Sequence, residues 1–458
     1  MQLSWTSFFL CAALAAAPAD LIVSAGKVVT MDGQRRVISN GAVAIAAGRI
    51  LAVGPRAEID RDYQAKHRID RPDSILTPGL INTHTHAPMS LLRGIADDLD
   101  LQEWLTKFIF PAEGKNVNVG FVRAGTRLAV LEMMLGGTTT YTDMYYFEDA
   151  IADETKKAGM RGVLGQTIIG FPVSDYKTPQ AALAGAETFI QKFKNDPLIT
   201  PAVAPHAIYT NSPETLKAAR ALADKYVVPY IIHVSETKKE NDDCAKEHGG
   251  ATPTAYLESL GVLNTGRTLF AHSVWSTPAD IAILKTRHVG VAHCPSSNMK
   301  LGSGAAPIAA MLDAGVNVGL GPDGPAGSNN DFDMFEEMDL AAKLAKVTSH
   351  DPKALPATRV FEMATLGGAR ALGMEKEIGS LEPGKRADLI TVSQSAPNAW
   401  PAHDVYSMLV FALKASDVQD VIIEGRPTVE NKRPLTLNPI EVRKEAAAIR
   451  AKVDASLK

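Results

Sequence analysis

The feature that most constrains the fold is a regular alternation, over residues 75–320, of short apolar runs typical of strands with stretches of helical periodicity. The helical stretches include residues 122–135, 213–225 and 278–285. Eight strands that alternate with helices predict a (β/α)8 TIM barrel, an α/β fold whose chemistry stands at the carboxyl ends of the strands. The strand candidates are residues 75–82, 138–143, 162–168, 199–204, 230–234, 268–271, 289–292 and 316–320.

A doubly wound open sheet is the alternative arrangement of the same alternation. No Gly-rich phosphate-binding loop follows the first strand candidate, which argues against the dinucleotide-binding version of that fold. The barrel is therefore the preferred prediction.

Both flanks of the alternating region are rich in short strands beside Gly-containing turns. Together they predict one small β-sandwich domain built from both chain ends, with the barrel inserted between its parts. We place the first part at residues 20–76, the barrel at residues 77–383, and the second part at residues 384–458. The second part ends in a helix over residues 439–457, which we expect to be solvated.

Residues 1–19 resemble a signal peptide. The apolar run at residues 8–16 precedes Ala17-Pro18-Ala19, which fits the small-residue cleavage pattern, although no Lys or Arg precedes the run. The run is too short to span a bilayer. We expect export to the periplasm after cleavage, or a cytoplasmic location if the segment is not a functional signal.

The composition limits the classes of partner that the chain is expected to bind. The formal net charge of −4 gives no electrostatic basis for binding nucleic acid. Three cysteines, Cys11, Cys244 and Cys294, are too few for a disulfide framework. We expect a small-molecule substrate, no nucleic-acid partner and no stable membrane insertion, and we leave open whether the chain forms a homo-oligomer.

Histidines gather at the ends of the predicted barrel strands. His84 and His86 are two positions apart at the end of one strand, so both imidazoles project to the same face. Six of the eleven histidines lie at such strand ends. A structural role in the core could explain one of them, but not the position that all six share. The other four are His206, His233, His272 and His293.

Ligand chemistry selects a metal-binding set from these residues. Neutral imidazoles with one carboxylate suit Zn²⁺, with Fe²⁺ as the alternative, and leave an open position for water. We assign His84, His86, His233 and Asp323 as the ligands. A metal ion lowers the pKa of its water from 15.7 to about 7, and the Asp323 carboxylate is placed to accept that proton.

Two further residues are candidates for proton transfer. Glu236 lies three residues beyond His233, where a carboxyl group can exchange protons with a substrate, and His272 can hold the attacking water or polarise the substrate. Binuclear hydrolases of this architecture carry a bridging Lys at the fourth strand. Residues 199–204 instead run into Pro205-His206, so we expect one metal ion.

The sequence resembles the mononuclear deaminase and chlorohydrolase-like branch of the amidohydrolase superfamily, and is most similar to the 5'-methylthioadenosine/S-adenosylhomocysteine deaminases. The resemblance covers nearly the whole chain after residue 19. It rests on residues 20–23 (DLIV), 77–86 (TPGLINTHTH), 293–298 (HCPSSN), 300–302 (KLG), 321–324 (GPDG), 328–330 (SNN) and 383–389 (PGKRADL).

The resemblance implies the same metal ligands and hydrolytic deamination of an adenine nucleoside, with release of ammonia. It also implies that Glu236 delivers a proton to the ring nitrogen beside the attacked carbon, that Trp104 packs against the nucleoside, and that Glu113 and His206 bind the ribose hydroxyls. Gln166 stands where the S-adenosylhomocysteine enzymes place a carboxylate-binding Arg. Methylthioadenosine or adenosine is therefore the favoured substrate.

Two other classes of function compete with this hypothesis. The same metal site could hydrolyse a guanine, pterin, triazine or cyclic amide, but Glu113 and His206 favour a substrate with ribose. A non-enzymatic binding protein would not need the full ligand set together with Glu236. A nucleic-acid deaminase is excluded, because the chain has no H-x-E with P-C-x-x-C pattern.

Overall fold

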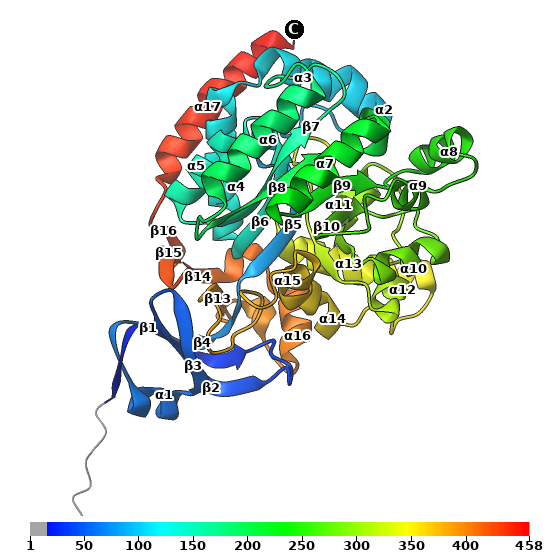
Figure 1. Ribbon diagram of the computed structural model, residues 1–458. Helices are drawn as coiled ribbons and strands as arrows, with labels where there is room; N and C mark the ends of the chain where they lie inside the picture. Colours follow the sequence, from blue (N-terminus) through cyan, green and yellow to red (C-terminus); the bar gives the residue numbers. More distant parts are fainter. Residues whose placement is uncertain (1–15, 458) are drawn as a thin grey trace, which may run out of the picture.

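The computed structural model describes residues 16–457, which form a closed barrel and a separate mixed sheet (Figure 1). The barrel strands are parallel and follow one another around the barrel in chain order, with β12 beside β5 closing the ring. The predicted TIM barrel is confirmed. Its strands are β5 (Leu80–Thr85), β6 (Thr138–Tyr145), β7 (Arg161–Ile168), β8 (Ile199–Pro205), β9 (Tyr230–Val234), β10 (Thr268–His272), β11 (Gly290–His293) and β12 (Val318–Leu320).

The first predicted barrel strand, residues 75–82, is wrong as a single element. The chain leaves the other sheet at the end of β4 (Tyr63–Pro78), turns at Gly79, and enters the barrel at Leu80. A Cβ atom at position 79 would lie 2.1 Å from Thr139 Oγ1, so this crossing requires glycine. The apolar run continues across the junction because both strands are buried there.

Strands from both chain ends form the accessory sheet, as the insertion predicts. Its eight strands are joined in one continuous order, β16-β15-β14-β13-β4-β1-β2-β3, so the predicted sandwich is a single hydrogen-bonded mixed sheet. Only β1 and β4 pair in parallel within it. The strands other than β4 are β1 (Ala17–Val29), β2 (Val37–Ala46), β3 (Arg49–Pro55), β13 (Leu389–Ser393), β14 (Val418–Ile423), β15 (Arg426–Glu430) and β16 (Arg433–Pro434).

Most of the predicted signal peptide, residues 1–15, lies outside the described residues. The proposed cleavage motif lies within β1, where Ala17, Pro18 and Ala19 pair with Tyr63, Gln64 and Ala65. Cleavage there would remove the first residues of this strand, and export stays a prediction. Among residues 16–457, no helix has both the length and the apolar character that crossing a membrane requires.

Serine and threonine caps begin several of the barrel helices. Thr178, Ser212, Thr252 and Thr277 each precede a proline, and each side chain accepts a hydrogen bond from a backbone N–H of the first turn. The helices before the last are α1 (Arg56–Asp62), α2 (Leu101–Glu103), α3 (Phe110–Asn116), α4 (Val119–Leu135), α5 (Glu148–Ala158), α6 (Pro179–Phe193), α7 (Pro213–Tyr226), α8 (Lys238–Glu247), α9 (Pro253–Ser259), α10 (Pro278–Thr286), α11 (Pro295–Lys300), α12 (Ile308–Ala314), α13 (Met334–Ser349), α14 (Ala357–Glu362), α15 (Gly368–Ala371) and α16 (Val405–Ser407).

The last helix, α17 (Pro439–Ser456), packs on the barrel helices α3 and α4 (red in Figure 1). Val442 and Val453 are buried there, and Arg127 of α4 binds both carboxylate oxygens of Glu445. We predicted this helix as a solvated part of the accessory domain. The structure differs from this prediction because one apolar stripe of the helix, which contains both valines, is buried against the barrel, although the rest of the helix is largely polar.

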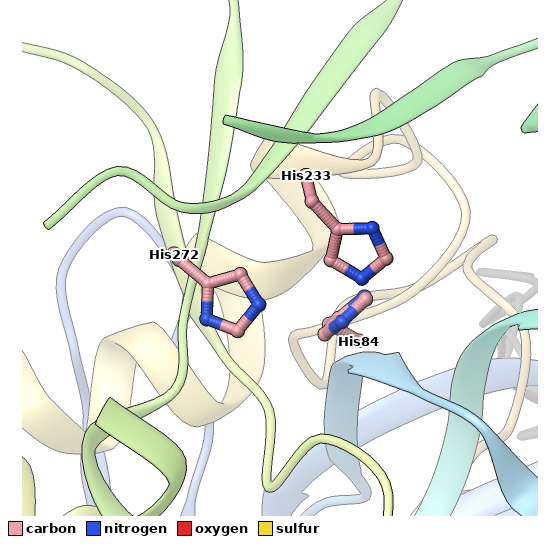
Figure 2. Close-up of side chains that lie close together, drawn as sticks. All are labelled: His84, His233 and His272. Atoms are coloured by element: carbon pink, nitrogen blue, oxygen red, sulfur yellow. The ribbon is translucent and has the colours of Figure 1, made fainter. Parts of the chain in front are cut away.

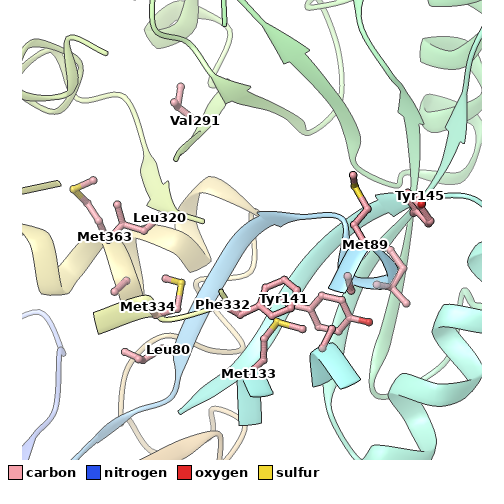
Figure 3. Packing of buried hydrophobic residues seen from close by; sticks show 14 of the residues in the cluster. Leu80, Met89, Met133, Tyr141, Tyr145, Val291, Leu320, Phe332, Met334 and Met363 are labelled. Carbon is pink, nitrogen blue, oxygen red and sulfur yellow. The ribbon is translucent and has the colours of Figure 1, made fainter. Parts of the chain in front are cut away.

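Two hydrophobic layers hold the barrel together. Helices pack against its outer face in a large cluster that includes Leu80, Tyr141 and Leu320 (Figure 3). A separate cluster fills the interior with small and branched side chains, including Val163 and Ile231. The interior is thus a packed core, and a cavity can form only above it, where the strands end.

Candidate active site

Strand ends bring the predicted metal ligands together. His84 and His86 stand on β5 and just after it, His233 stands on β9, and Asp323 follows β12 by three residues. Figure 2 shows the rings of His84, His233 and His272 directed at one another. His84 Nε2 and His86 Nε2 each lie 3.3 Å from Asp323 Oδ1. All four predicted ligands therefore converge on one point.

Hydrogen bonds to backbone carbonyls orient the imidazoles of His86 and His233. His86 Nδ1 donates to the Met144 carbonyl at 2.7 Å, and His233 Nδ1 donates to the His206 carbonyl at 2.8 Å. A carbonyl only accepts, so Nδ1 carries a proton in both rings and Nε2 is the atom directed at the other predicted ligands. The two Nε2 atoms face each other at 3.3 Å. Within residues 16–457 the buried His84 has no hydrogen-bond partner at either ring nitrogen. These donor atoms fit a bound divalent cation.

Asp323 is held as an anion at this point. Ser297 Oγ donates to its Oδ2 at 2.8 Å, and the Gly324 backbone N–H donates to its Oδ1 at 2.7 Å. Burial opposes ionisation, but the contacts with His84 and His86 outweigh it and hold the pKa of Asp323 well below its ordinary value. A buried carboxylate of this kind can bind a cation and accept a proton from water beside it.

Glu236 carries its proton near neutrality. Burial, followed by the nearby Asp323 charge, raises the pKa of Glu236 to about 8. Its Oε2 lies 3.8 Å from Nε2 of His272, whose Nδ1 lies 3.0 Å from Asn298 Oδ1. Because that amide oxygen only accepts, His272 holds its proton on Nδ1. Burial also lowers the pKa of His272, which keeps the ring neutral.

Backbone strain is concentrated at the same strand ends. Ser235, His272, Ser273 and Asp323 have φ values of 53°, 71°, 51° and 70°, in the left-handed region that favours glycine. Strain of this kind persists where surrounding contacts hold it. Here the Glu240 carboxylate accepts the backbone N–H groups of Ser235 and its neighbour, at 3.0 and 2.8 Å.

A cavity that is open to solvent lies above the ligand set. Trp104, Glu113, His206, Glu236 and His272 all line it, so the structure brings every predicted substrate contact to one space. Most of the remaining lining is apolar. Within the described residues, neither Lys nor Arg reaches the cavity lining.

The predicted substrate contacts are fixed by partners from other elements. Trp104 Nε1 donates to the Ala326 carbonyl at 2.7 Å, which sets the plane of the indole. His206 Nδ1 lies 3.2 Å from Thr210 Oγ1, and burial lowers the pKa of His206 to about 3. The imidazole is therefore neutral and can both accept and donate hydrogen bonds.

Two residues noted in the sequence lie outside the cavity lining. Gln166 is buried on β7 and donates to Asp175 Oδ2 at 2.9 Å, so its side chain serves the fold around the site. His293 is buried at the end of β11, and it too is outside the lining. The sequence singled out residues 293–298 without giving roles to Ser297 and Asn298, which the structure shows supporting Asp323 and His272.

Comparisons with known proteins identify the family of this chain. The sequence model of the amidohydrolase family matches residues 75–428. Proteins named 5-methylthioadenosine/S-adenosylhomocysteine deaminase are 47% identical in Thermodesulfovibrio yellowstonii (90% of this chain, 94% of that protein) and 46% identical in Syntrophobacter fumaroxidans (93% and 96%). A crystal structure of an adenosine deaminase from Xanthomonas campestris with bound zinc superposes with a TM-score of 0.94 at 40% identity, covering 96% of this chain and 100% of that one. The family match spans well over half of the sequence, and the chain belongs to the amidohydrolase family.

Proposed function

We propose that this amidohydrolase deaminates an adenine nucleoside by hydrolysis and releases ammonia. The observation that carries the proposal is one cavity above a His₃Asp set, lined by a protonated Glu236 and by the two ribose candidates, Glu113 and His206. The names of the similar proteins, which are adenine-nucleoside deaminases, support the same reaction. Water adds at the amino-bearing ring carbon, and the C–N bond then breaks.

One divalent ion, Zn²⁺ in preference to Fe²⁺, is the cofactor in this proposal, held by His84, His86, His233 and Asp323. It would act as a Lewis acid that makes water nucleophilic near neutral pH. The proposal is supported by three imidazoles with one carboxylate, by the zinc-bound relative, and by β8, which ends at Pro205 without a Lys to bridge a second ion.

The side chains divide the proton transfers between them. Asp323 is ionised and takes a proton from the attacking water, while Glu236 is protonated and gives its proton to the ring nitrogen beside the attacked carbon. His272, oriented by Asn298, presents its Nε2 lone pair toward the same point and holds the water in line. The proton from Glu236 stays on the ring nitrogen of the product, and the proton held by Asp323 passes to the amino group, which leaves as ammonia. The hydroxyl of the adduct returns its proton to Glu236 as the carbonyl forms.

The rest of the cavity selects the nucleoside. Trp104 packs against it, and Glu113 and His206 bind the ribose hydroxyls. Because neither Lys nor Arg lines the cavity within residues 16–457, the carboxylate of S-adenosylhomocysteine lacks a cationic clamp there. We therefore expect 5'-methylthioadenosine or adenosine to be the better substrate.

Metal content tests the ligand assignment. We expect close to one divalent ion per chain by elemental analysis, and loss of both the ion and ammonia release in His84→Ala or Asp323→Ala. His67→Ala is the matched control, because His67 lies half exposed on the accessory sheet. Two tightly bound ions per active chain would refute the single-metal assignment, and full activity after metal removal would refute metal dependence.

A further inference from the structure

Two neighbouring tyrosines donate hydrogen bonds to the Glu113 carboxylate. Tyr145, the last residue of β6, donates its hydroxyl to Glu113 Oε1 at 2.6 Å, and Tyr146 donates to Oε2 at 3.3 Å. Both rings are buried, lie 4.8 Å apart between centroids and line the same cavity as the carboxylate. Each carboxylate oxygen thus has one fixed donor from the barrel wall.

The Glu113 carboxylate can accept further hydrogen bonds, although it is almost completely buried. A carboxylate offers about four lone-pair positions, so two remain after the tyrosines have donated. Within the described residues its side chain has no other hydrogen-bond partner and no ion-pair partner, although only 4% of Glu113 is exposed. Glu113 lines the cavity with acceptor capacity left on both oxygens, which points to a ligand that brings two donors.

The chemistry of such a ligand is a vicinal diol. The two diol hydroxyls can each donate to one carboxylate oxygen only if the plane of the carboxylate is fixed. The two tyrosine hydroxyls, which donate to opposite oxygens, fix this plane. Burial raises the pKa of Glu113 to about 7, and the tyrosine hydroxyls act against this shift by stabilising the anion.

We propose that Tyr145 and Tyr146 are positioning residues that orient the Glu113 carboxylate toward the ribose diol and so make the site selective for ribonucleosides over deoxyribonucleosides. Neither hydroxyl needs to touch the reacting atoms. The shorter contact belongs to Tyr145, which therefore dominates the pair. The proposal rests on the proposed nucleoside function and deepens it.

The test compares adenosine with its 2'-deoxy and 3'-deoxy analogues on the zinc-loaded enzyme. We expect Tyr145→Phe to lower kcat/KM for adenosine at least about tenfold, mainly through KM, because a charge-assisted hydrogen bond that orders Glu113 is lost. The deoxy analogues should lose less, so the preference for ribose should shrink. Tyr146→Phe should change it in the same direction by a smaller factor.

Tyr141→Phe is the matched control. Tyr141 lies on the same strand, is fully buried and bonds Thr155 at 2.5 Å, but it lies outside the cavity lining (both tyrosines are labelled in Figure 3). It should leave the ribose preference unchanged. A Tyr145→Phe enzyme that loses activity equally on all three substrates, or keeps its ribose preference with full metal content, would overturn the proposal.

A binding measurement separates this inference from the deamination itself. Calorimetric titration of the holoenzyme with inosine and 2'-deoxyinosine needs no turnover, and we expect the ribose preference of the wild type to fall in Tyr145→Phe. If that pattern holds while no adenine nucleoside is deaminated, only the proposed function fails. If the wild type binds both nucleosides equally, the positioning role fails.

Discussion

Two carboxyl groups a short distance apart behave differently in this cavity. Asp323 is ionised because imidazoles surround it, whereas Glu236 stays protonated because it is buried beside that negative charge. Opposed environments of this kind allow one site to accept and deliver protons at the same pH. The residue assignments for base and acid follow from this difference.

Glu236→Gln tests the acid at the residue scale. The amide cannot deliver a proton, so we expect turnover to fall at least about 10²-fold while metal content and folding stay unchanged. In the wild type, kcat/KM should fall as pH rises above about 8, since the protonated form of Glu236 is then lost. Glu247→Gln, an exposed change at the end of α8, is the control. Near-normal turnover in Glu236→Gln would remove this residue from the mechanism.

The sequence predicted that the proposed metal ligands lie close together, but it did not predict the residues that support them. His84, His86 and His233 follow apolar strand patterns, and strand ends meet at one face of a barrel, so their proximity follows from topology alone. Asn298 and Tyr145 act through contacts with residues far away along the chain, and no local pattern gives such pairings.

At the scale of elements, the junctions between the two sheets were hardest to predict. The strand pattern crosses Gly79 without interruption, because β4 and β5 are both buried on either side of it. Likewise, the sequence of α17 shows its helical period but not which surface its two buried valines meet. Strand positions within the barrel were predictable because each is bounded by helices of clear period.

Arg161 is the element-scale link that can be measured. It begins β7, is 2% exposed, and binds Asp388 at 2.7 Å while its Nη2 lies 2.5 Å from Glu424 Oε2, both in the accessory domain. We expect Arg161→Met to lower the free energy of unfolding by about 3–5 kcal/mol, because two carboxylates lose their buried cation. Arg61→Met, on an exposed pair, should leave the free energy of unfolding nearly unchanged. Equal costs in denaturant titrations would contradict the link.

For the whole molecule, the two sheets have separate tasks. The accessory sheet contacts the barrel at the starts of the barrel strands, through Arg161 and through the hydrogen bond that the Gly79 N–H donates to the Asp388 carbonyl (Figure 1). The site lies at the opposite ends of the strands. The barrel was predictable from periodicity, and the insertion from the matching strand-rich flanks. The substrate depends on side chains from several elements, so it stays a proposal.

The most direct test of the central claim is kcat/KM for ammonia release from 5'-methylthioadenosine, adenosine, S-adenosylhomocysteine and free adenine by the zinc-loaded enzyme. One of the first two should be the best substrate, with S-adenosylhomocysteine lower by about tenfold or more, since a charge-assisted bond of about 1.5–3 kcal/mol is missing. Free adenine should be poor, because it leaves Glu113 and His206 without ribose partners. A preference for S-adenosylhomocysteine would contradict the missing clamp, and an enzyme that releases no ammonia from any of the three nucleosides would contradict the account as a whole.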